Sequence, residues 1–365
     1  MSTLAVRESH GLYTRGHLGG GMKHPSLGFA LLVTVAVAAA AHAQAPSIRN
    51  EPGTLRVRLL GTNGGPTINA QRLGISTLVE AGTEKLVFDC GRGSPAGLSR
   101  LGIPVTNVRK VFITHLHSDH VIGIPELYLF PWASTGRTLP FEVWGPTGTR
   151  SMMDHLQRAF AFDIHVRRDV DEKFSAEGIR VIAHDIREGV IYESNGVRVT
   201  AFLVDHRPVT PSFGYRLDYG GYSVVISGDT RPSENLVKFA QGADVLIHEI
   251  GAWKQDPLLS GPLDELIPGT NATRRQRRTI AEHHTDAEQV GAVFEKVKPR
   301  LAVLSHYAPN ANILPLVRKT YTGPIELGED ELTIDVGASI RVERFAPAAS
   351  GAGSTASLRT NPGLH

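Results

Sequence analysis

The chain has 365 residues, of which 41% are hydrophobic and 20% charged, enough apolar sequence for a large buried core. Its formal net charge is +2, and residues 1–43 hold three basic residues and one acidic residue. The chain after residue 43 is therefore close to neutral and lacks the basic excess of a nucleic-acid-binding protein. The single cysteine, Cys90, excludes an internal disulfide, and we expect it to be a small buried residue.

The N-terminal region carries the features of a secretory signal peptide. The basic Lys23 precedes a nearly continuous apolar run over residues 27–41, and the Ala41-His42-Ala43 cleavage pattern follows. The run is too short to span a membrane comfortably, and an uncleaved anchor or a buried helix is the alternative. We predict that residues 1–43 are a signal peptide with an upstream extension, and we expect a periplasmic or secreted protein with no stable membrane span after cleavage.

Residues 44–345 read as one α/β domain in which short apolar strands alternate with helices. Expected strands cover residues 55–60, 76–80, 85–89, 110–114, 141–144, 197–204, 223–227, 245–247 and 301–305. Expected helices lie around residues 94–101 and at 147–160, 233–241 and 285–297. Helices between strands predict a layered architecture with two sheets. Residues 254–281 form a polar insertion, and the Ala/Ser/Gly-rich tail over residues 346–365 is expected to be disordered.

The segment His115-Leu116-His117-Ser118-Asp119-His120 places four potential metal ligands within six residues, directly after an apolar strand. Imidazole and carboxylate at this density suit borderline divalent metals, above all zinc. One zinc ion needs only about four ligands. Because more candidates follow downstream, the crowding suggests two ions.

Three later strands each deliver a histidine or aspartate to the loop that follows them. These residues are His206 after Leu203-Val204-Asp205, Asp229 after Ser227-Gly228, and His306 after Leu304-Ser305. A single strand-terminal histidine is more often structural than ligating. Four such strand ends in one chain indicate parts of a fold that converge on one site.

With these segments in this order, the sequence resembles the metallo-β-lactamase superfamily, in the branch of ribonuclease Z, arylsulfatase-type and related phosphodiesterase enzymes. The resemblance extends to Gly61-Thr62-Asn63-Gly64-Gly65-Pro66 and Phe88-Asp89-Cys90-Gly91, and covers roughly residues 55–340. It implies a four-layered αββα sandwich with a dinuclear site on one edge.

The resemblance also implies a ligand set for two zinc ions per chain. One ion is expected at His115, His117 and His206. The other is expected at Asp119, His120 and His306, with Asp229 bridging. A bridging carboxylate holds two cations about 3.5–4 Å apart, the separation used in two-metal hydrolysis.

The same branch has a proton-handling pair, and the corresponding stretches here are His248-Glu249-Ile250-Gly251 and His283-His284-Thr285. We take Glu249 and His284, together with Asp119, as the catalytic candidates. The carboxylate of Glu249 would orient the imidazole of His284, which would protonate the leaving group. Both stretches depart from the family pattern, so the choice between His283 and His284 stays open. A helix-start histidine with a structural partner is the alternative.

The leading hypothesis is an exported zinc-dependent hydrolase that cleaves a phosphodiester or sulfate ester of a small molecule by a metal-bound hydroxide. The alternatives are a lactam or lactone hydrolase, a ribonuclease Z-like nuclease and a non-catalytic metal-binding protein. A nucleic-acid partner is disfavoured by export and by the neutral charge, and a homodimer is one expectation, since the related branch is commonly dimeric. The run Arg274-Arg275-Gln276-Arg277-Arg278 is either a solvated face or a contact for an anionic substrate.

Overall fold

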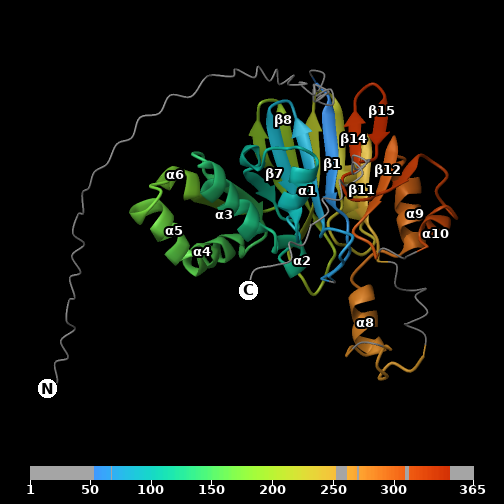
Figure 1. Ribbon diagram of the computed structural model, residues 1–365. Coiled ribbons are helices and arrows are strands. Elements are labelled where there is room, and N and C mark those ends of the chain that lie inside the picture. The colour runs from blue at the N-terminus through green and yellow to red at the C-terminus, as the bar shows by residue number, and fades with distance from the viewer. Residues whose placement is uncertain (1–52, 67, 252–260, 269–270, 309–311, 346–365) are drawn as a thin grey trace, which may run out of the picture. The chain divides into compact units, whose positions relative to one another are not determined.

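The computed structural model describes residues 53–66, 68–251, 261–268, 271–308 and 312–345. The predicted signal peptide and the predicted disordered tail lie outside these residues. Within them, two sheets stand face to face, with helices on the outer side of each (Figure 1). No helix in the described ranges combines the length and the apolar character that a membrane crossing requires.

The first sheet has eight strands in the order β15-β14-β1-β2-β3-β4-β5-β6. Strands β1 to β3 and their partners β14 and β15 are antiparallel, whereas β3 to β6 run parallel. The bounds are β1 Leu55–Gly61, β2 Ser76–Ala81, β3 Glu84–Phe88, β4 Lys110–Phe112, β5 Phe141–Gly145, β6 Val181–Asp185, β14 Thr333–Val336 and β15 Ile340–Glu343.

The second sheet has seven strands in the order β13-β12-β11-β10-β9-β8-β7. Strands β7 to β10 are antiparallel, and β10 to β13 are parallel. The bounds are β7 Gly189–Ser194, β8 Val197–Val204, β9 Ser212–Tyr219, β10 Tyr222–Ile226, β11 Val245–Glu249, β12 Leu301–Ser305 and β13 Ile325–Leu327.

The helices lie in the connections between consecutive strands. Those between strands of the first sheet are α1 Ser94–Arg100, η1 Val105–Asn107, α2 Ser118–Val121, α3 Ile124–Thr135, α4 Thr149–Ala159, α5 Ala161–His165, η2 Val166–Val170 and α6 Ala176–Ile179. Those of the second sheet are α7 Glu234–Ala240, α8 Arg274–Ala281, α9 Ala287–Val297 and α10 Leu314–Val317. The capping boxes Thr273/Gln276 and Asp286/Gln289 start α8 and α9 by satisfying their first backbone N–H groups.

Three hydrophobic cores separate the four layers. Along β4, Phe112 points into the core between the sheets, and its neighbours Val111 and Ile113 point into the core under the outer helices. The same alternation recurs on β12, where Val303 faces the opposite sheet and Leu304 the core with α9. Because both faces are buried, these strands read as continuous apolar runs. This pattern marks most of the predicted strands, and all nine are confirmed to within two residues. Strand β8 is an exception, because it also has exposed residues.

Six strands and several helices were not predicted. The helix α3 escapes prediction because it is apolar on most sides and contains Pro131. Strands β6, β7, β13 and β15 are only partly buried, so they lack the apolar run that marks the central strands. The predicted polar insertion contains the helix α8 in its last eight residues.

Candidate metal centre

The loop after β4 supplies four of the candidate ligands. The strand ends at Phe112, residues 113–117 run on to α2, and His117 precedes the first turn of that helix in an extended conformation (φ −64°, ψ 147°). Asp119 and His120 then lie in the short helix itself. This break between strand and helix lets neighbouring side chains turn toward one point at the edge of both sheets.

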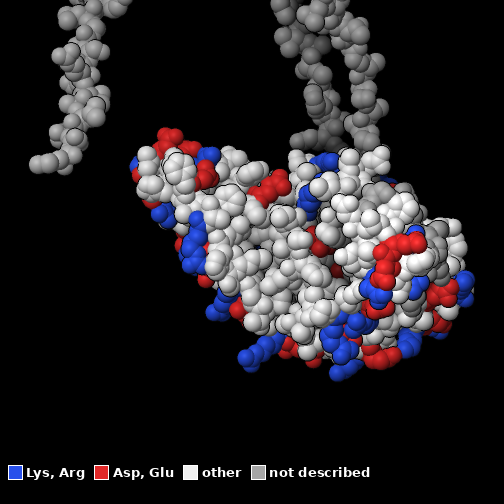
Figure 2. Space-filling model, turned by 90° about the horizontal axis from the view of Figure 1, so that it is seen from below, with Lys and Arg blue, Asp and Glu red and all other residues white. Residues whose placement is uncertain are grey.

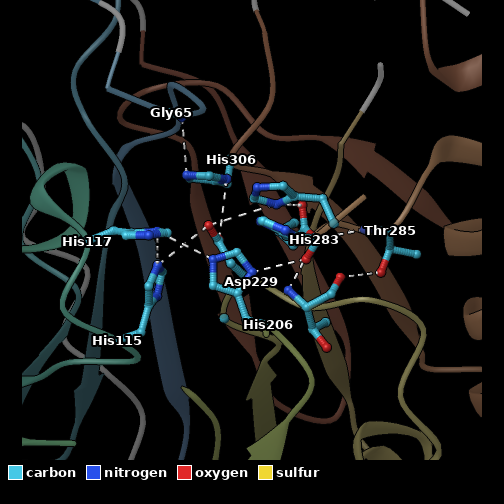
Figure 3. Close-up of polar contacts among 12 residues, drawn as sticks. Gly65, His115, His117, His206, Asp229, His283, Thr285 and His306 are labelled. Atoms are coloured by element: carbon cyan, nitrogen blue, oxygen red, sulfur yellow. Dashed lines mark hydrogen bonds and ion pairs between the residues drawn. The ribbon is translucent and has the colours of Figure 1, made fainter. Parts of the chain in front are cut away.

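His115, His117 and His206 form the first group. The Nε2 atom of His115 lies 3.0 Å from Nδ1 of His117, and Nε2 of His206 lies 3.4 Å from the same atom. His206 follows β8 of the second sheet, so this group spans the two sheets (Figure 3). These three donors are close enough to bind one ion.

Asp119, His120 and His306 form the second group. The Oδ2 atom of Asp119 lies 3.6 Å from Nε2 of His120 and 3.3 Å from Nε2 of His306. His306 follows β12, and its Nε2 atom also accepts a hydrogen bond of 3.3 Å from the backbone N–H of Gly65 (Figure 3). The structure therefore brings together the same two groups that the sequence predicts.

Asp229 lies between the two groups. Its Oδ2 atom is 3.8 Å from Nε2 of His115 and 3.3 Å from Nε2 of His120, and its Oδ1 atom is 3.4 Å from Nδ1 of His306. The preceding Gly228 has φ +60°, and a Cβ there would lie 2.4 Å from the carbonyl oxygen of Phe213. Only glycine fits this turn, which aims the carboxylate at both groups.

Hydrogen bonds on the far side of three imidazoles, those of His115, His120 and His206, fix their orientation. The hydroxyl of Thr114 contacts Nδ1 of His115 at 3.0 Å, and Nδ1 of His206 donates to the carbonyl oxygen of His283 at 3.0 Å. Nδ1 of His120 contacts Oδ2 of Asp89 at 2.8 Å. Such partners fix the tautomer of a metal-binding histidine and leave Nε2 free for the ion.

Asp89 was not predicted as a site residue. Besides holding His120, its carboxylate accepts hydrogen bonds from the backbone N–H and the hydroxyl of Thr114. Asp89 and His306 both have left-handed backbones, with φ of 56° and 51°. Non-glycine residues in this region are strained, and such strain clusters at functional sites. The available signal for Asp89 was a carboxylate at the end of a strand that adjoins β4.

The donor set fits divalent zinc. His115, His120, His206 and Asp229 are buried, and the Nε2 atom of His120 has no hydrogen-bond partner among the described residues. Burial keeps the pKa of His115 well below its ordinary value, so this imidazole is in its neutral, ligating form. Burial also opposes charge on His120, but the carboxylates of Asp229, Asp89 and Asp119 raise its pKa well above the ordinary value. The centre thus attracts positive charge.

Glu249 and His284 stand beside the centre. Glu249 ends β11, and its Oε2 atom lies 3.2 Å from Nδ1 of His284. Its Oε1 atom accepts hydrogen bonds from the backbone N–H groups of Thr230 and Thr285, at 3.3 and 3.0 Å. Burial disfavours the imidazolium, yet Glu249 and then Asp229 raise the pKa of His284 to about 9.

The structure places His284, rather than His283, against this carboxylate. Nδ1 of His284 also lies 3.9 Å from Oδ2 of Asp229. His283 instead contributes its backbone carbonyl to His206 (Figure 3).

A cavity of about 340 Å³ opens over the centre. Its floor is formed by ligand candidates from both groups and by Asp229, and His117 is exposed there. Its walls are mostly apolar, with His283, His284 and Arg277 as further polar groups; the apolar residues are Pro66, Pro208, Val209, Ile250, Ile280 and Ala308. Seen from this edge, acidic side chains lie in a hollow of largely uncharged surface (Figure 2). The volume is that of a small-molecule site.

The sequence is similar to those of known proteins. Residues 84–307 match a family model described as a beta-lactamase superfamily domain. A ribonuclease Z from Mycobacterium sp. (strain KMS) is 33% identical over 289 residues, which cover 77% of this chain and 96% of that protein.

Two solved structures share the fold. The metallo-beta-lactamase fold protein YhfI from Bacillus subtilis has a TM-score of 0.57 at 18% identity, and the alignment covers 78% of this chain and 100% of YhfI. The short form of human tRNase Z has a TM-score of 0.54 at 24% identity, with 76% of this chain and 98% of that protein covered. This likeness confirms the predicted αββα sandwich.

Proposed function

The chain belongs to the metallo-β-lactamase superfamily of metal-dependent hydrolases, and we propose that it hydrolyses a phosphodiester or sulfate ester of a small molecule with two zinc ions. The observation that carries the proposal is the position of Asp229. Its carboxylate lies within 3.8 Å of imidazole nitrogens from both ligand groups, at the floor of a cavity. A carboxylate shared in this way suits a pair of cations better than a single one.

The ligand roles follow from the contacts. His115, His117 and His206 would hold one ion, Asp119, His120 and His306 would hold the other, and Asp229 would contact both. Two zinc ions bound there supply Lewis acidity toward the ester and lower the pKa of a water molecule toward about 7. Thr114, Asp89 and the carbonyl of His283 fix the orientation of the imidazoles of His115, His120 and His206.

His284 handles the proton of the leaving group in this proposal. Its Nδ1 is engaged by Glu249, so Nε2 is the nitrogen that is available to a substrate in the cavity. Glu249 is itself fixed by two backbone N–H groups, which prevents the imidazole from rotating away. An oriented imidazole within reach of the scissile bond is the arrangement that general acid catalysis requires.

A ribonuclease Z-like activity is the second candidate, and the 33% identity to a ribonuclease Z favours it. The bond that is cleaved is again a phosphodiester, so the chemistry of the centre is the same. The segment that contains the helices α4 to α6 carries no net charge, because residues 149–180 hold six basic and six acidic side chains. This balance favours a small substrate over RNA. Several of these side chains pair with each other, as Arg167 does with Asp163 and Arg180 with Glu177. An RNA-binding surface needs an excess of basic charge.

Purified protein lacking residues 1–43, with its zinc content measured, tests both candidates. Its substrates are bis(4-nitrophenyl) phosphate, 4-nitrophenyl sulfate, a lactone, a cephalosporin and a precursor RNA. We expect turnover of the phosphodiester or the sulfate ester. Turnover of the lactone or the cephalosporin alone would refute the proposal, and cleavage of the RNA alone would establish the second candidate. Tight zinc binding without turnover of any substrate would indicate a non-catalytic metal-binding protein.

We also propose that the protein is exported, on the strength of the apolar run over residues 27–41 and the Ala41-His42-Ala43 pattern. The experiment is N-terminal sequencing of the protein from the periplasmic or secreted fraction. A mature chain that begins at Gln44 supports export. An intact N-terminus in the cytoplasmic fraction contradicts it.

A further inference from the structure

The basic run on α8 divides into side chains with different surroundings. Nη1 of Arg274 lies 2.9 Å from Oε2 of Glu265, and Nε of Arg275 lies 2.9 Å from Oδ1 of Asp264. These two positive charges are therefore balanced by the turn that precedes the helix. Arg277 belongs to a different face, because it lines the cavity over the candidate metal centre.

The helical register explains why Arg277 reaches the cavity. The capping box of Thr273 and Gln276 fixes where α8 begins. Arg277, Ile280 and His284 follow at spacings of three and four residues, which places them on one side of a helix. All three line the cavity. The helical turn continues past Ala281, whose carbonyl accepts a hydrogen bond of 3.3 Å from the N–H of His284.

The end of α8 is anchored to the metal-centre loops. Nε of Arg231 donates to the carbonyl oxygen of Glu282 at 2.6 Å, and Nη1 of Arg231 lies 3.4 Å from Oδ1 of Asp205, the neighbour of His206. The N–H of Thr285 donates to Glu249. Since both anchors act at its C-terminal end, α8 presents Arg277 to the cavity in a defined orientation.

The surroundings make this cation effective. Arg277 shares the cavity with apolar side chains such as Ile250, Val209 and Pro208. Apolar surroundings strengthen the attraction between a guanidinium and an anion. Among the described residues that line this cavity, Arg277 is the one arginine; the other polar side chains there are Ser118, the ligand candidates, and His283 and His284.

We propose that Arg277 is a specificity-determining residue that binds an anionic oxygen of the substrate. The apolar alcohol portion of that substrate packs against Ile250 and Ile280. The site then prefers phosphate and sulfate esters with an aryl or branched alkyl group over neutral esters and lactones. This inference rests on the proposed function, and it explains which part of the arginine run contacts the substrate.

The experiment compares R277Q with R278Q, a matched control that removes the same charge from the same helix at an exposed position that does not line the cavity. The ligand is phenyl phosphate, and its Kd for the zinc-loaded protein is measured by titration calorimetry. We expect R277Q to weaken binding at least about tenfold, because a hydrogen bond to a charged group is lost. R278Q is expected to bind like the wild type, and R277K to retain part of the affinity. Equal affinities of R277Q and the wild type, or equal losses in both glutamine variants, would overturn the proposal.

A second readout separates substrate selection from a general structural effect. The KM of bis(4-nitrophenyl) phosphate is expected to rise at least about tenfold in R277Q, with a much smaller effect on the neutral ester 4-nitrophenyl acetate. Equal losses on both substrates would indicate a structural role and contradict the inference. If the wild type turns over neither substrate, the proposed hydrolase function fails. The calorimetric comparison still decides whether Arg277 binds the anion.

Discussion

Asp229 is the residue on which the two-ion proposal depends, and D229A tests it directly. We expect the variant to fold, because its neighbours Ser227 and Gly228 set the turn, but to bind one zinc ion or fewer. Activity should fall by more than about 100-fold, since even residues that only orient ligands change activity by about 10–100-fold. Zinc content is measured by mass spectrometry of the metal after gel filtration, and kcat with the substrate found in the screen.

Asp218 provides the control for that experiment. It is a partly exposed aspartate on the neighbouring strand β9, paired with Arg216 at 3.0 Å and not among the metal-binding groups. D218A is expected to keep both ions and full activity. Two zinc ions retained in D229A would contradict the bridging role.

Cys90 illustrates how burial decides reactivity. Its side chain is fully buried, as predicted, and burial raises the pKa of the thiol to about 12. Because the thiolate is the reactive form, iodoacetamide should not label the native protein at about pH 8, and raising the pH to about 9.5 should not change this. The measurement is the mass of the protein after treatment. Complete labelling in guanidinium is the positive control, and rapid labelling of the native protein would contradict the buried position.

At the scale of single residues, local sequence predicts the ligand candidates but not the residues that hydrogen-bond and orient them. His115, His117, Asp119 and His120 form a dense motif after an apolar strand, so their convergence could be expected from the sequence alone. The role of Asp89 depends on a contact with His120, 31 residues away, which no local pattern encodes. The choice between His283 and His284 likewise depends on how the chain leaves α8.

At the scale of elements, most of the strands that could be predicted are buried on both faces, and β8, with its exposed Arg198 and Leu203, is an exception. Strand β9 is buried yet was missed, because its Gly214 and charged Arg216 interrupt the apolar pattern. Gly214 is required there by packing, since a Cβ would lie 2.4 Å from the ring of Phe202. Packing against Phe202 of the neighbouring strand β8 therefore decides the residue at position 214, although glycine has a low propensity for strands.

A buried ion pair between β3 and β4 of the first sheet, hydrogen-bonded to Tyr192 of the second sheet, gives a stability prediction. Nζ of Lys110 on β4 lies 2.6 Å from Oε2 of Glu84 and 2.5 Å from the hydroxyl of Tyr192 on β7. We expect K110M to lower the free energy of unfolding by about 3–5 kcal/mol, because it leaves the buried Glu84 carboxylate without its cationic partner. The control K296M removes an exposed pair with Glu234, which contributes about 1 kcal/mol or less. Urea unfolding at neutral pH measures both.

The pair of Lys110 and Glu84 also predicts how the loss of stability in K110M depends on pH. Burial alone raises the pKa of Glu84, but the hydrogen bonds from Lys110 and Asn195 outweigh it, so the pKa is lowered. Its stabilising contribution is therefore present above the ordinary pKa of about 4.3 and is lost as the pH falls through the folded value. The deficit of K110M should therefore shrink mainly as the pH falls below about 4.3. A deficit that is constant with pH would show that the loss comes from packing and not from charge.

At the scale of the whole domain, the candidate ligands come from both sheets. His115, His117, Asp119 and His120 follow β4 of the first sheet, whereas His206, Asp229 and His306 follow strands of the second. The parallel strands β4, β11 and β12 end at this edge, where the loops of the sandwich meet (Figure 1). Bound ions would join the sheets on the side where acidic and imidazole groups otherwise lie crowded together.

Zinc should therefore stabilise the domain as well as serve its chemistry. A ligand present at about 100 times its Kd adds about 2.7 kcal/mol to the free energy of unfolding. For a domain of this size we expect a rise in Tm of roughly 5 °C or more when zinc is added to chelator-treated protein. The measurement is a thermal melt followed by circular dichroism, with D218A expected to show the full rise and D229A a smaller one. An equal rise in D229A would mean that zinc stabilises the protein elsewhere, because a centre that joins the sheets through Asp229 cannot keep its full effect without that carboxylate.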